Sequence, residues 1–400
     1  MLINNLNSKY NPLYFLAALG AGGLAVSFFM YPNFLIAHQG TPLLTFDQIY
    51  PLLTGEDKLT AILLSGALIA IASLALLHFR LLFWNISEYR KFKRTEEFQT
   101  LIKSNREISL MVIPLTLAMS VNVSFILGAV FVPGLWGIVE YLFPAAIVAF
   151  LAIGVYALKI LGDYLSRIFI NGDFNFSENN NFTQMIAIFA LTMIAVGLAA
   201  PGAMSHHKEI NAIGMFSSIF FLSIAVILMV IKMTLAFKST LEHGVDKATS
   251  ASLWMMIPIL TLMGITIIRL TMGLHHGFEE TLSKSSFFII TSTVISLQIF
   301  IGMVGYKVMK SIGYFRDHSQ GSRANAGSFA LICPGVAFFV FGMFFLVFGL
   351  VQNNLVELMS PAFFVLLAPL VLIHLQTLRV FFRLLCKVTA CGPCKVSIAA

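Results

Sequence analysis

The sequence predicts an all-α membrane protein whose ten transmembrane helices form five tandem hairpins around a central pore. Three observations favour this fold class. The 400 residues are 58% hydrophobic and 11% charged, whereas a soluble domain carries about 25% charged residues. Ten apolar runs are each long enough to cross a bilayer, which takes roughly 20 residues. Almost all Lys and Arg residues fall on one side of these runs, as in oriented membrane proteins.

The ten runs give the expected elements in chain order. Each run is continuously apolar, whereas strands of an outer-membrane barrel alternate in polarity over about ten residues. Because backbone groups in lipid must be satisfied within the element, we expect each run to be a helix. The first run is too long for the apolar region of a signal peptide, so we expect it to be retained. The predicted spans are 12–36, 59–84, 108–132, 136–162, 182–203, 210–236, 251–275, 285–309, 326–351 and 358–385.

The distribution of basic residues predicts the orientation of the chain. If the N-terminus is cytoplasmic, 21 of the 25 Lys and Arg residues lie inside. The outside holds Lys58, Lys208 and Lys284, and Arg269 lies within a span. This asymmetry favours a multi-pass protein of the bacterial inner membrane with both termini cytoplasmic. The basic residues flank spans, where they meet the headgroups of the lipid bilayer, so the net charge of +7 does not indicate nucleic-acid binding.

No loop is large enough for a soluble domain, so residues 1–385 are expected to form a single ten-helix transmembrane domain. Residues 386–400 are expected to form a cytoplasmic tail with Cys386, Cys391 and Cys394. The Cys-Gly-Pro-Cys spacing is typical of thioredoxin-like redox sites, but that chemistry needs a strand-to-helix context that the sequence lacks. We interpret the tail as a reduced segment, and soft-metal binding by its three thiols is the alternative.

Two kinds of span alternate along the chain. Spans 3 and 7 share a pattern around Ile-Pro114-Leu-Thr and Ile-Pro258-Ile-Leu, and span 9 carries Cys333-Pro334 at a similar depth. The odd-numbered spans are rich in small residues and proline, which allow close helix approach and bends. The even-numbered spans are bulkier. The alternation favours an inner ring of five bent helices within five lipid-facing helices, and tight packing without a pore is the alternative.

The tandem pairs and proline motifs resemble the tellurite-resistance/dicarboxylate transporter family, which includes bacterial TehA and the plant slow anion channel. The stretch Ser328-Phe-Ala-Leu-Ile-Cys-Pro-Gly335 is similar to the start of the ninth span in that family. The likeness covers roughly residues 12–385. It implies a pore between the odd-numbered spans that passes small inorganic or organic anions. It also implies a homo-oligomer, commonly a trimer, with one pore in each protomer.

The resemblance also suggests which residues line the pore. In the family, a Phe of span 9 plugs the pore just before a Pro or Gly. Alignment on Pro334 places Cys333 at that position, so the gate here is either a Phe in another register, such as Phe338, or a different device. The residues expected to line the pore are Gly20, Gly23, Pro114, Ser120, Gly197, Pro258, Thr261, Cys333, Pro334 and Phe338.

One basic residue lies well inside a span. Arg269, in the outer half of span 7, carries a charge that costs about 3 kcal/mol at the centre of a helix in a bilayer and normally faces the protein interior or water. We expect it to attract anions toward the pore, and the alternative is a snorkelling side chain paired with Glu140 or a headgroup. Because the odd-numbered spans offer almost no acidic residue, a channel or uniporter is favoured over a proton-coupled carrier.

Two histidines leave a different class of function open. His78 and His374 lie in the inner halves of even-numbered spans, and a pair on facing helices can ligate a b-type haem. The sequence has no phosphate-binding Gly-rich loop and no Ser/His/Asp order, so we expect no enzyme activity, cofactor or metal. The predicted function is passage of small anions. The alternatives are a proton-linked carrier of dicarboxylate, sulfite or another sulfur oxyanion, and a membrane redox or scaffold subunit.

Overall fold

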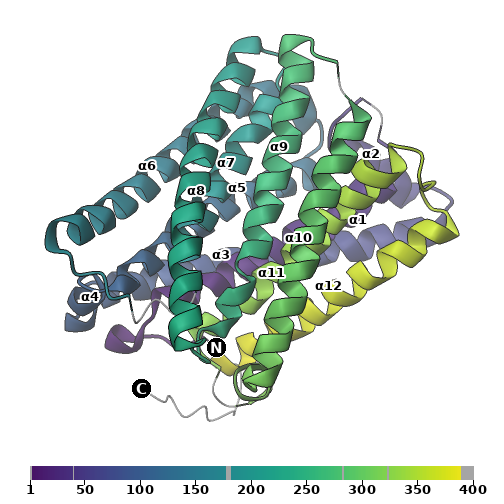
Figure 1. Cartoon of the computed structure of the whole chain (residues 1–400). Helices are drawn as coiled ribbons and strands as arrows, with labels where there is room; N and C mark the ends of the chain where they lie inside the picture. The colour runs from purple at the N-terminus through teal and green to yellow at the C-terminus, as the bar shows by residue number, and fades with distance from the viewer. Residues whose placement is uncertain (1, 39, 177–181, 282, 322–323, 389–400) are drawn as a thin grey trace.

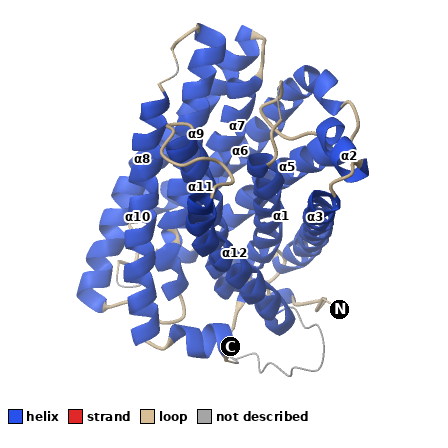
Figure 2. Ribbon diagram, turned by 90° about the vertical axis from the view of Figure 1, so that its right-hand side faces the viewer, coloured by secondary structure: helices blue, strands red, loops and turns tan. Residues whose placement is uncertain are grey.

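In the computed structural model, which describes residues 2–38, 40–176, 182–281, 283–321 and 324–388, every regular element is a helix (Figure 2). Within this part of the chain, ten helices are long and apolar enough to cross a membrane, which confirms the all-α class and the number of spans. The long helices lie side by side in one bundle (Figure 1). These features are those of a multi-pass membrane protein.

Burial divides the ten long helices into two sets. Between 61% and 94% of the apolar part of five helices is buried, against 28% in each of the other five. The first set, the inner helices, comprises α1 (Phe15–Leu35), α5 (Val112–Phe131), α7 (Ile186–Met204), α9 (Met256–Phe278) and α11 (Ile332–Phe344). The π-helical segment η10 (Phe345–Val351) continues α11 and completes its span. The second set, the outer helices, comprises α3 (Lys58–Phe92), α6 (Val139–Asn171), α8 (Lys208–His243), α10 (Lys284–Ser311) and α12 (Pro361–Val388).

The inner helices contact one another in a closed cycle that runs from α1 through α5, α7, α9 and α11 and back to α1. Each inner helix also packs against the outer helix that follows it in the chain. The most enclosed inner helix is α7, which contacts α5, α6, α8 and α9. In its span, 94% of the apolar part is buried, and Figure 1 shows α7 between the labels of α6 and α9. The centre of the bundle is therefore built by the five inner helices.

Each inner helix is preceded by a short 3-10 segment. These segments are η2 (Pro12–Tyr14), η3 (Asn105–Met111), η6 (Thr183–Met185), η7 (Ser250–Trp254) and η9 (Ala326–Leu331). Contacts join η9 to η2 and η7, and η3 to η2 and η6, while Phe182 N donates to Ser252 Oγ between η6 and η7. The five inner helices therefore begin at the same end of the bundle, which we call the starting end.

The prolines of the shared motif mark the junction between these segments and the helices. Pro114, Pro258 and Pro334 are each the third residue of the α-helix that follows a 3-10 segment. Proline is tolerated in the first turn of an α-helix. These three prolines therefore stand where the 3-10 geometry changes to α, near the start of each span. Proline does lie in the helix interior at Pro32 and Pro201.

Three outer helices extend beyond their predicted ends. The helices α3, α6 and α8 continue to Phe92, Asn171 and His243, each one to three turns past the predicted span. Apolar character fades where these helices leave the hydrocarbon, but their backbone bonds continue through more polar turns. The helix α12 likewise ends at Val388, so the exposed Cys386 belongs to it. Cys391 and Cys394 lie outside the described residues.

Two short helices occupy the longer loops. The helix α4 (Glu96–Leu101) lies in the loop between α3 and η3, and Thr95 accepts a hydrogen bond at its N-cap. The helix α2 (Phe46–Thr54) was not expected from the sequence. It starts with a capping box between Thr45 and Gln48 and buries only Ile49. Such an amphipathic turn is too short to register as an apolar run.

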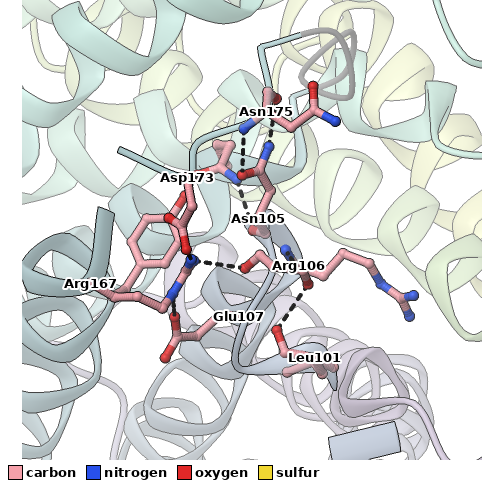
Figure 3. A network of polar contacts seen from close by, with 10 residues as sticks. Leu101, Asn105, Arg106, Glu107, Arg167, Asp173 and Asn175 are labelled. Carbon is pink, nitrogen blue, oxygen red and sulfur yellow. Dashed lines mark hydrogen bonds and ion pairs between the residues drawn. The ribbon is translucent and has the colours of Figure 1, made fainter. Parts of the chain in front are cut away.

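A polar cluster at the starting end fastens α6 to the segment in front of α5 (Figure 3). Arg167 Nε donates to Glu107 Oε2 at 2.9 Å, and Arg167 Nη2 donates to the Ser104 carbonyl at 2.9 Å. Arg167 Nη1 also bonds Asp173, in the segment that follows α6. The Arg167 and Glu107 side chains are only 14% and 10% exposed. An outer helix is thus tied to the start of an inner one by a nearly buried ion pair.

Candidate functional site: a cavity between the inner helices

A cavity of about 190 Å³ lies between the inner helices. All five of them contribute to its wall, together with the outer helix α6. The lining residues of α9 are Pro258, Thr261, Leu262, Ile265 and Arg269, spaced three and four apart. This spacing places them along one face of the helix. Each inner helix therefore presents a stripe, and not its whole circumference, to the cavity.

Six of the ten residues expected to line a pore belong to this wall: Gly20, Gly23, Gly197, Pro258, Thr261 and Cys333. Arg269, expected to attract anions, belongs to it as well. Pro114, Ser120, Pro334 and Phe338 are not among the lining residues. The structure thus brings most of the predicted residues together around one space and places four of them elsewhere.

The four residues outside the wall point away from the stripe of their helix. Ser120 faces α3, where its Oγ lies 2.8 Å from His78 Nε2 and donates to the Thr116 carbonyl. On α11 the stripe includes Cys333 and Ala337, so Pro334 and Phe338 follow one position later, about 100° around the helix. Pro114 is buried within the core beside the starting segments.

Sequence reasoning missed the contribution of an outer helix to the wall. Phe143, Ala146 and Phe150 of α6 all line the cavity. Phe150 reaches it over Gly197, where an added Cβ would lie 2.2 Å from the phenyl ring. The glycine therefore makes room for an aromatic ring to pass between inner helices. The only signal in the sequence was the spacing of three, four and seven among these α6 residues, which marks a common face.

The wall is largely apolar and carries one charged side chain, Arg269, among the lining residues. Arg269 Nη1 donates to the Val196 carbonyl at 2.7 Å. Asn122 adds an amide whose Nδ2 lies 3.5 Å from Met193 Sδ, a weak acceptor. The Thr261 hydroxyl is engaged, since it donates to the Ala337 carbonyl and accepts from Gln298 Nε2. The polar groups of the wall that can still form hydrogen bonds are thus mainly donors, the N–H groups of Arg269 and Asn122.

Arg269 does not pair with Glu140 among the described contacts. The Glu140 carboxylate accepts from Ser205 Oγ at 2.7 Å and from the His206 backbone N–H at 2.9 Å. It thereby caps the turn between α7 and α8, a packing role on the outer set of helices. The guanidinium of Arg269 is left facing the cavity with a backbone carbonyl as its recorded partner.

The two buried histidines are both saturated by hydrogen bonds. The ring nitrogens of His78 lie 2.7 Å from the Ala18 carbonyl and 2.8 Å from Ser120 Oγ. Those of His374 lie 2.8 Å from Ser27 Oγ and 2.9 Å from the Tyr31 hydroxyl. A haem ligand needs a free ring nitrogen. Neither histidine has one, because both ring nitrogens of each are hydrogen-bonded within the protein. Within the described residues, no cluster of His, Cys, Asp or Glu has metal-site geometry.

These contacts give both histidines a different task. Each belongs to an outer helix and binds the inner helix α1, His78 from α3 and His374 from α12. His374 also stacks on Phe339 of α11, with ring centroids 4.3 Å apart.

Comparison with known proteins found no matching protein-family model and no matching curated protein.

Proposed function

We propose that the chain is an anion channel or transporter of the bacterial inner membrane, which passes small inorganic or organic anions through a central passage in the protomer. The observation that carries the proposal is a largely apolar cavity, enclosed by a cycle of five inner helices, whose one charged lining residue is Arg269. The five helix pairs are then hairpins around this passage, with both termini cytoplasmic. By resemblance, the protomers form a trimer.

The shape of the lining supports a passage along the bundle. Lining residues on α7 run from Phe189 to Met204, about 23 Å at 1.5 Å per residue. Those on α11 run from Cys333 to Phe344, about 17 Å by the same rise. The hydrocarbon core is about 30 Å thick. The cavity wall therefore extends through more than half of the membrane.

The positive electrostatic potential along the passage favours the passage of anions over cations. Arg269 contributes a positive charge in a low-dielectric wall, where its effect on an ion is largest. All five inner helices begin at the starting end, so the positive ends of five helix dipoles surround that end. With the expected orientation, this is the cytoplasmic mouth of the passage. An anion entering from either side thus meets positive potential.

The lining favours a channel or uniporter over a proton-linked carrier of dicarboxylate or sulfite. No Asp or Glu occurs among the lining residues that the structure describes. A proton-coupled carrier uses a carboxylate or histidine that faces the substrate. The buried histidines do not fill this role, because both ring nitrogens of each are bonded within the protein.

Current through the purified protein in planar bilayers tests the proposal, with chloride, nitrate, sulfite and malate compared. We expect anion-selective reversal potentials and a roughly tenfold smaller current in Arg269→Gln, which corresponds to ~1.4 kcal/mol. Arg269→Lys, which keeps the charge, should retain most of the current. The matched control is Lys284→Gln at the start of α10, outside the cavity.

Two results would overturn parts of this proposal. Cation-selective reversal potentials, or no current from folded protein with any of the four anions, would remove the anion passage itself. Unchanged current and selectivity in Arg269→Gln would remove the role of Arg269 while leaving the passage in place. Current that saturates with anion concentration and follows a pH gradient would favour the carrier.

A further inference from the structure

A second hollow, independent of the central cavity, lies on the outside of the bundle between α3 and α12. Its volume is about 410 Å³. Ser73, Leu77 and Arg80 of α3 form one wall, and Leu378 and Phe382 of α12 form the other. The floor includes Phe28 of the inner helix α1. Both outer helices pack on α1, which lies between them in Figure 2.

This groove opens toward the surroundings of the protein. Leu76 at its edge is 72% exposed and Phe382 is 44% exposed. Because these residues belong to membrane-spanning segments, lipid is the surrounding phase. A groove 410 Å³ in volume with apolar walls, set between two helices, offers an acyl chain closer contact than a smooth helix face does.

One positive charge stands in the groove wall. Arg80 is exposed, and among the described residues it makes no ion pair. Arg379 on α12 is also exposed, and it directly follows the groove residue Leu378. A cation on a lipid-facing helix is costly unless a headgroup or water meets it. The groove therefore combines apolar walls with an unneutralised positive charge.

The depth of Arg80 matches a phosphate group. The helix α3 begins at Lys58, and Arg80 follows 22 residues later, about 33 Å along the axis at 1.5 Å per residue. The hydrocarbon core measures about 30 Å. With Lys58 at one membrane face, Arg80 thus reaches the headgroup level of the opposite leaflet, the leaflet of the starting end. The apolar part of the groove, from Ala70 to Leu77, lies within the hydrocarbon.

We propose that this groove binds one anionic phospholipid, with an acyl chain between α3 and α12 and the phosphate paired with Arg80. Basic pockets between transmembrane helices on the cytoplasmic side are known to favour anionic lipids. The lipid would fill the gap between two outer helices and contact α1 directly through Phe28. The proposal rests on the membrane-spanning bundle and not on conduction through the central cavity.

The test uses the full chain with Phe382→Trp, which places an indole in the groove, reconstituted into phosphatidylcholine vesicles. Quenching by brominated phosphatidylglycerol is compared with quenching by brominated phosphatidylcholine, after subtraction of the signal from the parent protein. We expect a preference of about fivefold for phosphatidylglycerol, the worth of one basic residue near the surface. Arg80→Gln should reduce the preference to about one, and Arg80→Lys should keep it.

The matched control is Arg90→Gln, because Arg90 is exposed on the same helix but does not line the groove. It should leave the preference unchanged. Equal quenching by the two lipids in the Phe382→Trp protein would overturn the proposal, as would a preference that survives Arg80→Gln. Absence of quenching by either lipid would also overturn it, because it would mean that another protein surface, such as a second copy of the chain, covers the groove. Thermal unfolding of each variant confirms that the protein compared is folded.

Discussion

The inner and outer helices are equally apolar but differ in what surrounds them. All ten pass the same test of length and hydropathy, yet burial of the apolar part ranges from 61% to 94% in the inner set and is 28% throughout the outer set. In a soluble protein, hydropathy distinguishes buried residues from exposed ones. In a membrane protein the interior and the lipid that surrounds it are both apolar, so hydropathy does not distinguish them. The comparison shows that hydrophobicity alone does not decide which helix lies inside.

The largest effect is expected where an outer helix holds an inner one through charge. Arg167→Ala removes the partner of the nearly buried Glu107 carboxylate, and breaking a buried ion pair costs about 3–5 kcal/mol. We expect a clear drop in the melting temperature of the protein in detergent. The control is Lys159→Ala, an exposed cation on the same helix α6 with no recorded ion pair. Equal stability of the two variants would show that α6 is held by apolar packing alone.

The effect of replacing glycine on stability should have opposite signs at Gly273 of an inner helix and Gly66 of an outer one. At Gly273 of the inner helix α9, an added Cβ would lie 2.5 Å from the Gly202 carbonyl oxygen, and forced overpacking costs about 1–3 kcal/mol. At Gly66 of the outer helix α3, nothing lies within 4 Å of that position, so Gly66→Ala should stabilise the helix by up to about 1 kcal/mol. Thermal unfolding of Gly273→Ala and Gly66→Ala measures both. The same sign in both variants would contradict close backbone packing as the basis of the inner set.

The smallest effect concerns the loops at the starting end. Lys247 Nζ bonds Asp317 Oδ2 at 2.7 Å, and with Arg316 it lowers the pKa of the Asp317 carboxyl from 3.8 to about 2. A carboxyl with a depressed pKa stabilises the fold at pH values above its ordinary pKa, and this contribution is lost as the pH falls from about 4 toward 2. The melting temperature of Asp317→Asn should therefore lie below that of the wild type at pH 7, with the gap closing near pH 2.

The control for this pair is Glu242→Gln, since the Glu242–Lys238 contact is 3.8 Å long and exposed on both sides. It should leave the melting temperature unchanged at either pH. A gap between Asp317→Asn and the wild type that persists at pH 2 would show that the effect comes from something other than the charge of Asp317.

The span positions were predictable because hydropathy reports them directly. The alternation of small-residue and bulky spans matches the observed alternation of buried and exposed helices. At glycines of the inner helices such as Gly197 and Gly335, an added Cβ would lie 2.2 and 2.0 Å from a neighbouring side chain. The polar extensions of α3, α6 and α8 were missed because hydropathy falls before the helix ends. What composition shows is which helix is inside, not where that helix stops.

Single lining residues were harder to predict, because they depend on the rotation of each helix about its axis. One residue of error turns a side chain by about 100°, as Pro334 and Phe338 show beside the lining residues Cys333 and Ala337. Phe150 was missed for another reason. It belongs to an outer helix and enters the wall only because Gly197 leaves room. A contact of this kind joins segments that are distant in the chain, and the sequence of neither segment indicates it.

The contacts of α1 have a consequence for biosynthesis. This helix is made before the other inner helices. It nevertheless borders α11, and its Ser27 is bonded by His374 of α12, 347 residues later in the chain. Until those segments leave the ribosome, one flank of α1 faces lipid with the Ser27 and Tyr31 hydroxyls lacking their histidine partner. The helix pairs can enter the membrane one after another, but the cycle of inner helices closes only when α11 contacts α1. Folding of the whole domain is therefore completed late in translation.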